Sequence, residues 1–176
     1  MTTQVLSHPG ADEYAPYYNT YIAPVAGTNA LETLATQLGA LDPLRSLDDA
    51  RALHRYASDK WSVKETVAHI TDAERIFACR MLRIARGDKT PLPGFDQQPY
   101  VDAAQFDHLP IGTLVDSFRA TRAATIALTR EIDADAWLRT GTASGFTVSA
   151  RALAYIITGH AAHHIGILRD RYGMPV

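Results

Sequence analysis

Two histidines near the C-terminal end of the chain have the spacing of ligands to one metal ion. His160 and His164 are four residues apart and continue an apolar stripe that includes Leu153 and Ile156. Residues at positions i and i+4 of a helix lie on one face, with about 5–6 Å between their β-carbons, so one ion can bind both imidazoles. His163 is rotated by about 100° from His164 on a helix, and we expect it to point elsewhere.

A third histidine can complete such a site. His69 lies near the edge of the apolar stripe of an earlier helix. Three protein ligands and a water are typical of catalytic zinc sites. The H-E-x-x-H motif is absent, so the helix that carries His160 and His164 lacks the built-in general base of that motif. The spacing also permits a simpler alternative, in which the inward histidines are core residues that hydrogen-bond to neighbouring groups.

Glu74 lies in the middle of the same apolar stripe, five residues after His69. A buried carboxylate must be ion-paired, hydrogen-bonded or protonated. Glu74 is therefore our candidate catalytic residue, as a proton acceptor near a metal-bound water or as the acceptor of a ligand imidazole N–H. The alternative is an ion pair with an arginine of another helix. Cys79 lies on the opposite side of the helix and is a poor candidate ligand.

Helical patterns surround these residues. Ser62 and Glu65 form a capping box, in which each side chain satisfies a backbone N–H at the start of the helix. Apolar residues at helical spacing follow, and Gly87 is a suitable residue to end the helix, so we predict a helix over residues 62–86. The last predicted helix begins near Thr147 or Ser149 and runs to about residue 172.

Further helices are predicted on both sides of the long helix. Apolar periodicity predicts one from residue 28 or 29 to about 41, a weaker piece over 48–56, and a long one over 111–131. Residues 87–110 contain four prolines, so we predict no regular element there, and we predict a loop over 140–145. No period-two alternation is present, which favours an all-α fold. A four-helix bundle with one long crossover between its second and third helices fits this pattern.

The composition excludes several classes of function. The 176 residues carry 17 Lys and Arg against 19 Asp and Glu, and a net charge of −2 does not favour binding to nucleic acid. No apolar stretch approaches the roughly 18 residues of a membrane span. The single cysteine cannot form an internal disulfide and fits a reducing compartment. We expect one cytoplasmic domain over residues 1–176, with an N-terminal extension over 1–27 that is rich in tyrosine.

The chain resembles the DinB/YfiT-like superfamily of metalloenzymes over about residues 28–172. The resemblance is carried by two motifs, Trp61-Ser62-x-x-Glu65-x-x-x-His69-Ile70-x-Asp72-x-Glu74-Arg75 and Gly159-His160-x-x-His163-His164. It implies a four-helix bundle of up-down-down-up topology, dimers in many members, and a three-histidine divalent-metal site. Carried over by position, that site falls on His69, His160 and His164, whereas His163 matches a histidine that is usually not a ligand.

Two classes of function follow. The first is a divalent-metal-dependent enzyme that activates a water or a low-molecular-weight thiol for hydrolysis or thiol transfer of a small-molecule substrate, with zinc or nickel as the first candidates for the metal. The resemblance alone implies the thiol chemistry, which uses bacillithiol or mycothiol in some members. The second is a non-catalytic, stress-related helical domain for metal binding or interaction. We also predict a homodimer, and we expect Phe95 and Tyr100 of the crossover to line the mouth of a pocket.

Overall fold

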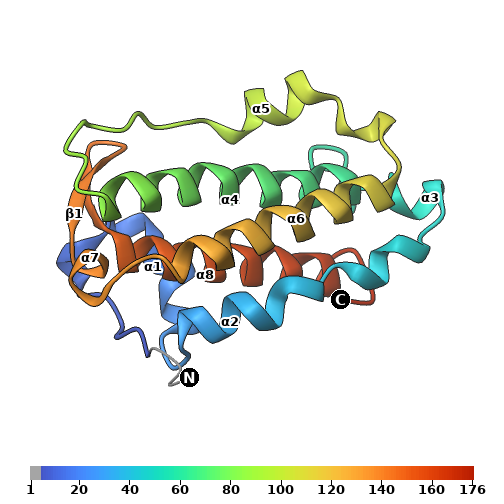
Figure 1. The fold of residues 1–176 in the computed structure, drawn as a ribbon. Coiled ribbons are helices and arrows are strands. Elements are labelled where there is room, and N and C mark those ends of the chain that lie inside the picture. The colour runs from blue at the N-terminus through green and yellow to red at the C-terminus, as the bar shows by residue number, and fades with distance from the viewer. Residues whose placement is uncertain (1–4) are drawn as a thin grey trace.

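Four helices form the bundle in the computed structural model, which describes residues 5–176. They are α2 (Ala30–Thr36), α4 (Val63–Ala85), α6 (Ile111–Thr129) and α8 (Ala150–Asp170). Figure 1 shows that α2 and α8 run in one direction and that α4 and α6 run in the other, which confirms the up-down-down-up order. The long crossover joins α4 to α6 along the outside of the bundle, and α4 packs most extensively against α8 and α6.

Shorter elements connect and cover these helices. The remaining α-helices and strands are α1 (Asn19–Ile22), α3 (Asp49–Ala52), α5 (Gln97–Ala104), α7 (Ala134–Trp137), β1 (Thr140–Ala143) and β2 (Phe146–Ser149). The 3₁₀ turns are Ala11–Glu13, Pro16–Tyr18, Ala23–Val25, Gln37–Gly39, Asp42–Ser46 and Phe106–His108. Within the described residues, no helix combines the length and the hydropathy that crossing a bilayer requires.

The capping box fixes the start of α4 as predicted. The backbone N–H of Glu65 donates to Ser62 Oγ at 3.0 Å, and the backbone N–H of Ser62 donates to Glu65 Oε2 at 2.7 Å. These two bonds satisfy donors that the first turn of a helix leaves without partners. The helix ends at Ala85, and Gly87 follows with a φ of +85°, a left-handed conformation that glycine adopts without strain. The structure thus confirms the predicted helix over 62–86 to within one residue at each end.

Two of the predicted helices and the crossover differ from the prediction. The helix expected over residues 28–41 ends at Thr36 and continues as 3₁₀ turns, and the piece expected over 48–56 is the single turn of α3. The crossover contains α5, which Asp96 caps by accepting from the backbone N–H of Gln98 at 3.0 Å. Pro99 is the third residue of α5, where its missing N–H removes no intrahelical hydrogen bond.

The predicted loop over 140–145 is wrong, because strands β1 and β2 form an antiparallel hairpin. Its register pairs Thr140 with Ser149 and Ala143 with Phe146. Ser144 and Gly145 connect the strands with φ angles of 54° and 82°, the positive values that a tight hairpin turn requires. Leu92 of the crossover also bridges to Ala143, which fixes the crossover against the hairpin.

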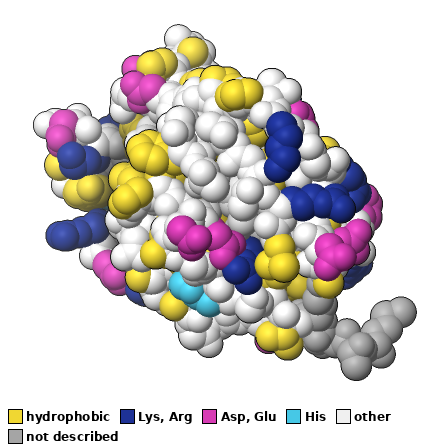
Figure 2. Space-filling view, turned by 90° about the vertical axis from the view of Figure 1, so that its left-hand side faces the viewer, with side chains coloured by type: hydrophobic (Ala, Val, Ile, Leu, Met, Phe, Trp, Pro, Cys, Tyr) yellow, Lys and Arg dark blue, Asp and Glu magenta, His cyan; other side chains and the backbone are white. Residues whose placement is uncertain are grey.

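The core occupies the space between the four long helices and extends under the N-terminal segment. Helix α1 packs on α8, so residues 5–29 cover part of the last helix. On the end of the molecule that carries the hairpin, Figure 2 shows apolar side chains in small separate groups among polar and charged ones.

Candidate metal centre

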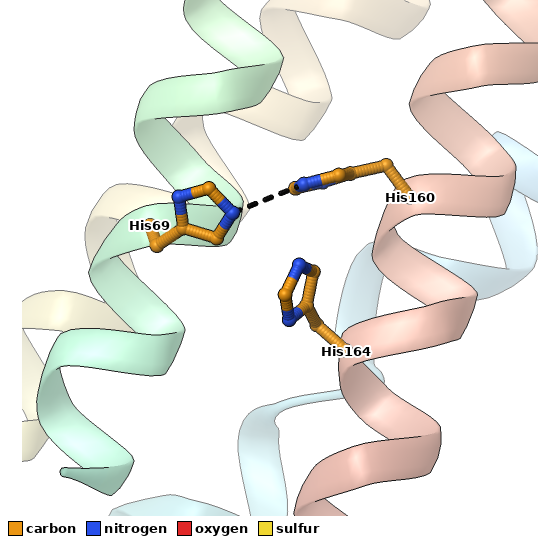
Figure 3. A group of neighbouring side chains, drawn as sticks. All are labelled: His69, His160 and His164. Carbon is orange, nitrogen blue, oxygen red and sulfur yellow. Dashed lines mark hydrogen bonds between the residues drawn. The ribbon is translucent and has the colours of Figure 1, made fainter. Parts of the chain in front are cut away.

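Three histidines converge between α4 and α8. His69 projects from α4, and His160 and His164 project from successive turns of α8 toward it (Figure 3). One ring nitrogen from each imidazole lies within 4.8 Å of the others, and the Nε2 atoms of His69 and His160 are 3.1 Å apart. The i, i+4 spacing on α8 and the close packing of the two helices therefore create a group with the donor set of a metal site.

Helix packing and ring contacts position the imidazoles. His69 and His160 are buried, and His164 is half-buried. The ring of Trp61, which directly precedes the capping box of α4, lies 4.6 Å from the ring of His69. The ring of Phe77 lies 5.8 Å from that of His160. These aromatic rings pack against the imidazoles and limit their orientations.

Burial keeps the three imidazoles neutral near pH 7. It lowers the pKa of His69 to about 4. Burial, together with the nearby His69 and His163 rings, lowers the pKa of His164 to about 3. Burial first, and then the nearby rings of His164, His69 and His163 and the charge of Arg122, hold the pKa of His160 well below its usual range. A neutral imidazole is the form that binds a metal ion, so the fold presents ligands that need no deprotonation.

The geometry fits a divalent ion. Within the described part of the chain, the only hydrogen bond of these three side chains is the one between His69 and His160. Two nitrogens bound to zinc at about 2.0–2.1 Å in a tetrahedral site lie about 3.3 Å apart, close to the 3.1 Å between these two Nε2 atoms. A shared ion would give all three buried imidazoles a polar partner, which buried polar groups require.

His163 points away from this group, as its position on the helix predicts. Its side chain is exposed, and its ring contacts those of Tyr21 at 5.4 Å and His164 at 5.0 Å. It lies outside the cluster of potential ligand atoms. Cys79 is likewise exposed, on a part of α4 away from the histidines.

Glu74 is ion-paired with Arg122 of α6. Arg122 Nη2 donates to Glu74 Oε2 at 2.8 Å, and Arg122 Nε donates to both carboxylate oxygens at 2.9 and 3.0 Å. Arg122 Nη1 donates to Gln37 Oε1 at 2.6 Å, and Gln37 Nε2 donates to the carbonyl of Thr158 at 3.0 Å. No hydrogen bond joins Glu74 to the three histidines in residues 5–176. The geometry matches the ion-pair alternative, and a catalytic role for Glu74 stays a prediction.

The N-terminal segment supplies one wall of the site, which the sequence did not predict. A cavity of about 90 Å³ brings the tyrosines of this segment next to His69 and His160. The ring of Tyr21 lies 5.2 Å from that of His160, and its hydroxyl lies 3.0 Å from the hydroxyl of Tyr17. Burial, and then the hydrogen bond with Tyr17, raises the pKa of Tyr21, so this phenol stays protonated. The available signal in the sequence was the spacing of Tyr14, Tyr17, Tyr18 and Tyr21 at i, i+3, i+4 and i+7, which places them on one helical face.

A larger cavity opens on the other side of the histidines. It measures about 260 Å³, and His164 lies in its wall beside Lys60, Trp61 and Tyr172. Gln98 of α5 also lines it and accepts a hydrogen bond from Trp61 Nε1 at 3.1 Å. The crossover therefore closes one side of this cavity, and Phe95 of the same crossover lines the smaller one. Both cavities therefore border the histidine cluster, the larger at His164 and the smaller at His69 and His160.

Comparison with known proteins finds a family match for the sequence and similar structures for the fold. The sequence profile described as the DinB superfamily matches residues 30–168. No curated protein sequence matches the chain. Two solved structures share its fold. YfiT from Bacillus subtilis, described as "a probable metal-dependent hydrolase with an unusual four-helix bundle topology", superimposes with a TM-score of 0.70 at 16% identity, over 94% of this chain and 93% of that one.

The second structure is a mycothiol-dependent maleylpyruvate isomerase. It superimposes with a TM-score of 0.64 at 19% identity over 84% of this chain, which spans 60% of the length of that protein. At these identities, the two matches establish the four-helix fold alone. The profile match begins at Ala30. The tyrosine wall therefore lies outside the matched region, whereas the three histidines lie within it.

Proposed function

The chain belongs to the DinB superfamily, and we propose that it is a hydrolase in which His69, His160 and His164 bind one divalent metal ion. The observation that carries this proposal is the convergence of three neutral imidazoles from two helices, with ring nitrogens within 4.8 Å of one another. Three histidine ligands leave a coordination position open, which distinguishes catalytic from structural zinc sites. The description of YfiT as a metal-dependent hydrolase supports the same class of reaction.

A divalent ion held by His69, His160 and His164 would supply an activated water, because such an ion lowers the pKa of a bound water toward 7. Zinc and nickel are our first candidates, since both suit imidazole ligands. The residues of the chain contribute the surroundings. The rings of Trp61 and Phe77 border His69 and His160, and each also lines one of the two cavities beside the cluster. Apolar walls lower the local dielectric and strengthen electrostatic interactions with a bound substrate.

The tyrosine pair is placed to bind the substrate. Tyr17 and Tyr21 line the same cavity as His69 and His160. Because Tyr21 stays protonated, its O–H can donate a hydrogen bond to a carbonyl or phosphoryl oxygen in that cavity. We assign Tyr21 the role of orienting the substrate within the 90 Å³ cavity. His164 faces the separate 260 Å³ cavity.

Thiol transfer is the second candidate. It is supported by the structural similarity to an isomerase that depends on mycothiol. The 260 Å³ cavity is lined by polar groups from Lys60, Gln98 and Tyr172, which can hydrogen-bond to a polar thiol. The same three histidines would serve both reactions, because a metal ion lowers the pKa of a bound thiol as well as that of a bound water.

Metal content tests the proposal first. We expect one zinc or nickel ion per chain after reconstitution, measured by elemental analysis. The variants His69→Ala, His160→Ala and His164→Ala should lose it, and the matched control His163→Ala should retain it. Loss in His163→Ala with retention in His164→Ala would contradict the assignment of the helix face.

Activity tests the reaction. We expect the loaded protein to hydrolyse members of an ester and amide panel, with at least a hundredfold loss in His160→Ala. Turnover only in the presence of a low-molecular-weight thiol would favour the second candidate. Stoichiometric metal without any turnover would favour a non-catalytic metal-binding domain.

A further inference from the structure

A separate cavity lies against α4, about three helical turns beyond His69. It measures about 310 Å³, and its wall includes Arg80 of α4 together with Leu92, Phe95 and Tyr100 of the crossover. The hairpin holds this wall in place, because the backbone N–H of Leu92 donates to the carbonyl of Thr142 at 2.9 Å. The cavity is therefore bounded by a long helix on one side and by a pinned segment on the other.

Arg80 is a buried cation without an acidic partner. Its exposed fraction is 4%. Its Nη2 donates to the carbonyl of Pro93 at 2.6 Å and to Ser144 Oγ at 3.4 Å. Within residues 5–176, no carboxylate lies within ion-pair distance of it, whereas the other fully buried arginine, Arg122, is paired with Glu74. Burying a charge without an opposite charge is unfavourable, so this arrangement lacks a compensating anion.

The free donors of Arg80 are accessible from the cavity. Its Nε and Nη1 have no hydrogen-bond partner among the described residues. In that part of the chain, two side-chain polar atoms are fully buried and also lack a hydrogen-bond partner, and these are Asp42 Oδ1 and Trp137 Nε1. Nε and Nη1 of Arg80 lack a partner but are not among them. These two nitrogen atoms therefore retain accessible surface. The rings of Phe77 and Phe95 lie 5.9 and 5.5 Å from the guanidinium carbon. Such contacts attract the cation but accept no conventional N–H hydrogen bond at these distances.

We propose that this cavity binds a small carboxylate with an apolar body. The carboxylate would accept hydrogen bonds from Arg80, whose planar guanidinium matches carboxylate geometry, and the apolar body would pack against Leu92 and Phe95. The largely apolar wall favours such a ligand over a strongly hydrated inorganic anion. Phe95 also lines the cavity next to His69, but a ligand held by Arg80 lies about three helical turns from that histidine and requires no metal ion.

Benzoate titration tests this site. We expect calorimetric binding of benzoate to the protein, both as purified and after metal chelation, and at least tenfold weaker binding of the neutral analogue benzyl alcohol. Arg80→Met should weaken benzoate binding at least tenfold. The control is Arg86→Met, because Arg86 follows the end of α4 and pairs with Glu131 outside the cavity. The affinity of this variant for benzoate should be unchanged. Unchanged affinity in a folded Arg80→Met variant would overturn the proposal.

A second measurement uses the unmodified chain, so that the proposal can be tested even if Arg80→Met does not fold. Cys79 is exposed, lines the same cavity and is the single cysteine of the sequence, so its alkylation by iodoacetamide reports on occupancy. We expect saturating benzoate to slow this alkylation at least fivefold in the native protein and to leave it unchanged in urea. No protection by benzoate would overturn the site, and equal protection by inorganic phosphate would overturn the choice of a carboxylate.

Discussion

The backbone carbonyl of Tyr21 occupies the space that the β-carbon of any other residue would need at Gly159. A β-carbon at position 159 would lie 2.0 Å from the carbonyl oxygen of Tyr21 and 2.6 Å from its carbonyl carbon. The obstacle is backbone, so it cannot move aside as a flexible side chain would. Gly159 directly precedes His160, and the glycine therefore allows the N-terminal segment to pack over the histidine cluster.

We predict that Gly159→Ala displaces the N-terminal segment. A glycine-to-alanine change within a helix normally stabilises it by about 0.5–1 kcal/mol, because alanine loses less conformational entropy. At position 159, we expect the clash with Tyr21 to reverse the sign and destabilise the protein by about 1–3 kcal/mol. Proteolysis should then release residues 5–29 more readily, as followed by mass spectrometry.

Gly166 provides the matched control on the same helix. A β-carbon there would meet only the end of the Arg169 side chain, at 3.8 Å. Gly166→Ala should therefore leave the N-terminal segment protected and should not lower the free energy of unfolding. Equal proteolytic sensitivity of the two variants would contradict the role of Gly159.

The ion pair of Glu74 with Arg122 predicts a stability effect. Both side chains are almost fully buried, so Glu74→Gln leaves the charge of Arg122 without compensation. We expect a loss of about 3 kcal/mol in the free energy of unfolding, measured by urea denaturation, with metal content unchanged.

A double variant separates this effect from catalysis. Glu74→Leu combined with Arg122→Met removes both charges and should recover most of the lost stability. If Glu74 is catalytic, turnover stays low in the stable double variant. If it is structural, turnover returns together with stability.

The metal-free protein should lose stability as the pH falls below about 6.5. The pKa of His69 is about 4 and that of His164 about 3 in the folded chain, against 6.5 for a histidine in an unfolded one. Between these values the unfolded chain binds more protons, so acid favours unfolding. We expect a loss of up to about 2 kcal/mol per imidazole between pH 7 and pH 5, and a smaller loss in His69→Ala. A urea midpoint that is constant over this range would contradict the buried neutral state.

Tyr21→Phe tests the proposed contact with the substrate. The variant keeps the ring against His160 but removes the hydroxyl that lies 3.0 Å from Tyr17. We expect unchanged metal content and about a tenfold loss of kcat/KM, the usual size for one hydrogen bond. Tyr14→Phe removes another hydroxyl of the same segment, one that lines neither cavity beside the histidines, and should have no such effect. Loss of metal in Tyr21→Phe would instead indicate a structural role.

The parts of the fold that local rules determine could be predicted from the sequence. The capping box and the apolar stripe of α4 act within a few residues, and the i, i+4 pair on α8 is set by helix geometry alone. The sequence offered an arginine of another helix as the partner of Glu74 but could not identify it, because Arg122 lies 48 residues away in the chain and meets Glu74 only through packing.

The hairpin was missed for a related reason. Its strands have four residues each, too few for alternation to stand out, and its turn uses Ser144 at a positive φ. Serine at such a position is uncommon, so the usual turn signal of Asn-Gly or Asp-Gly was absent. The packing of the tyrosine segment on α8 depends on Gly159. This packing could not be predicted, because a glycine has no side chain and so adds nothing to the periodic pattern of apolar residues.

The family match begins at Ala30, between the two parts of the candidate site. The three histidines lie on α4 and α8 within the match, whereas Tyr17 and Tyr21 lie on the segment that precedes it. Substitutions in that segment can reshape the 90 Å³ cavity without disturbing the helices that carry the histidines. Exchanging this leading stretch alone therefore changes which molecules fit beside the histidines, while the histidine cluster stays in place.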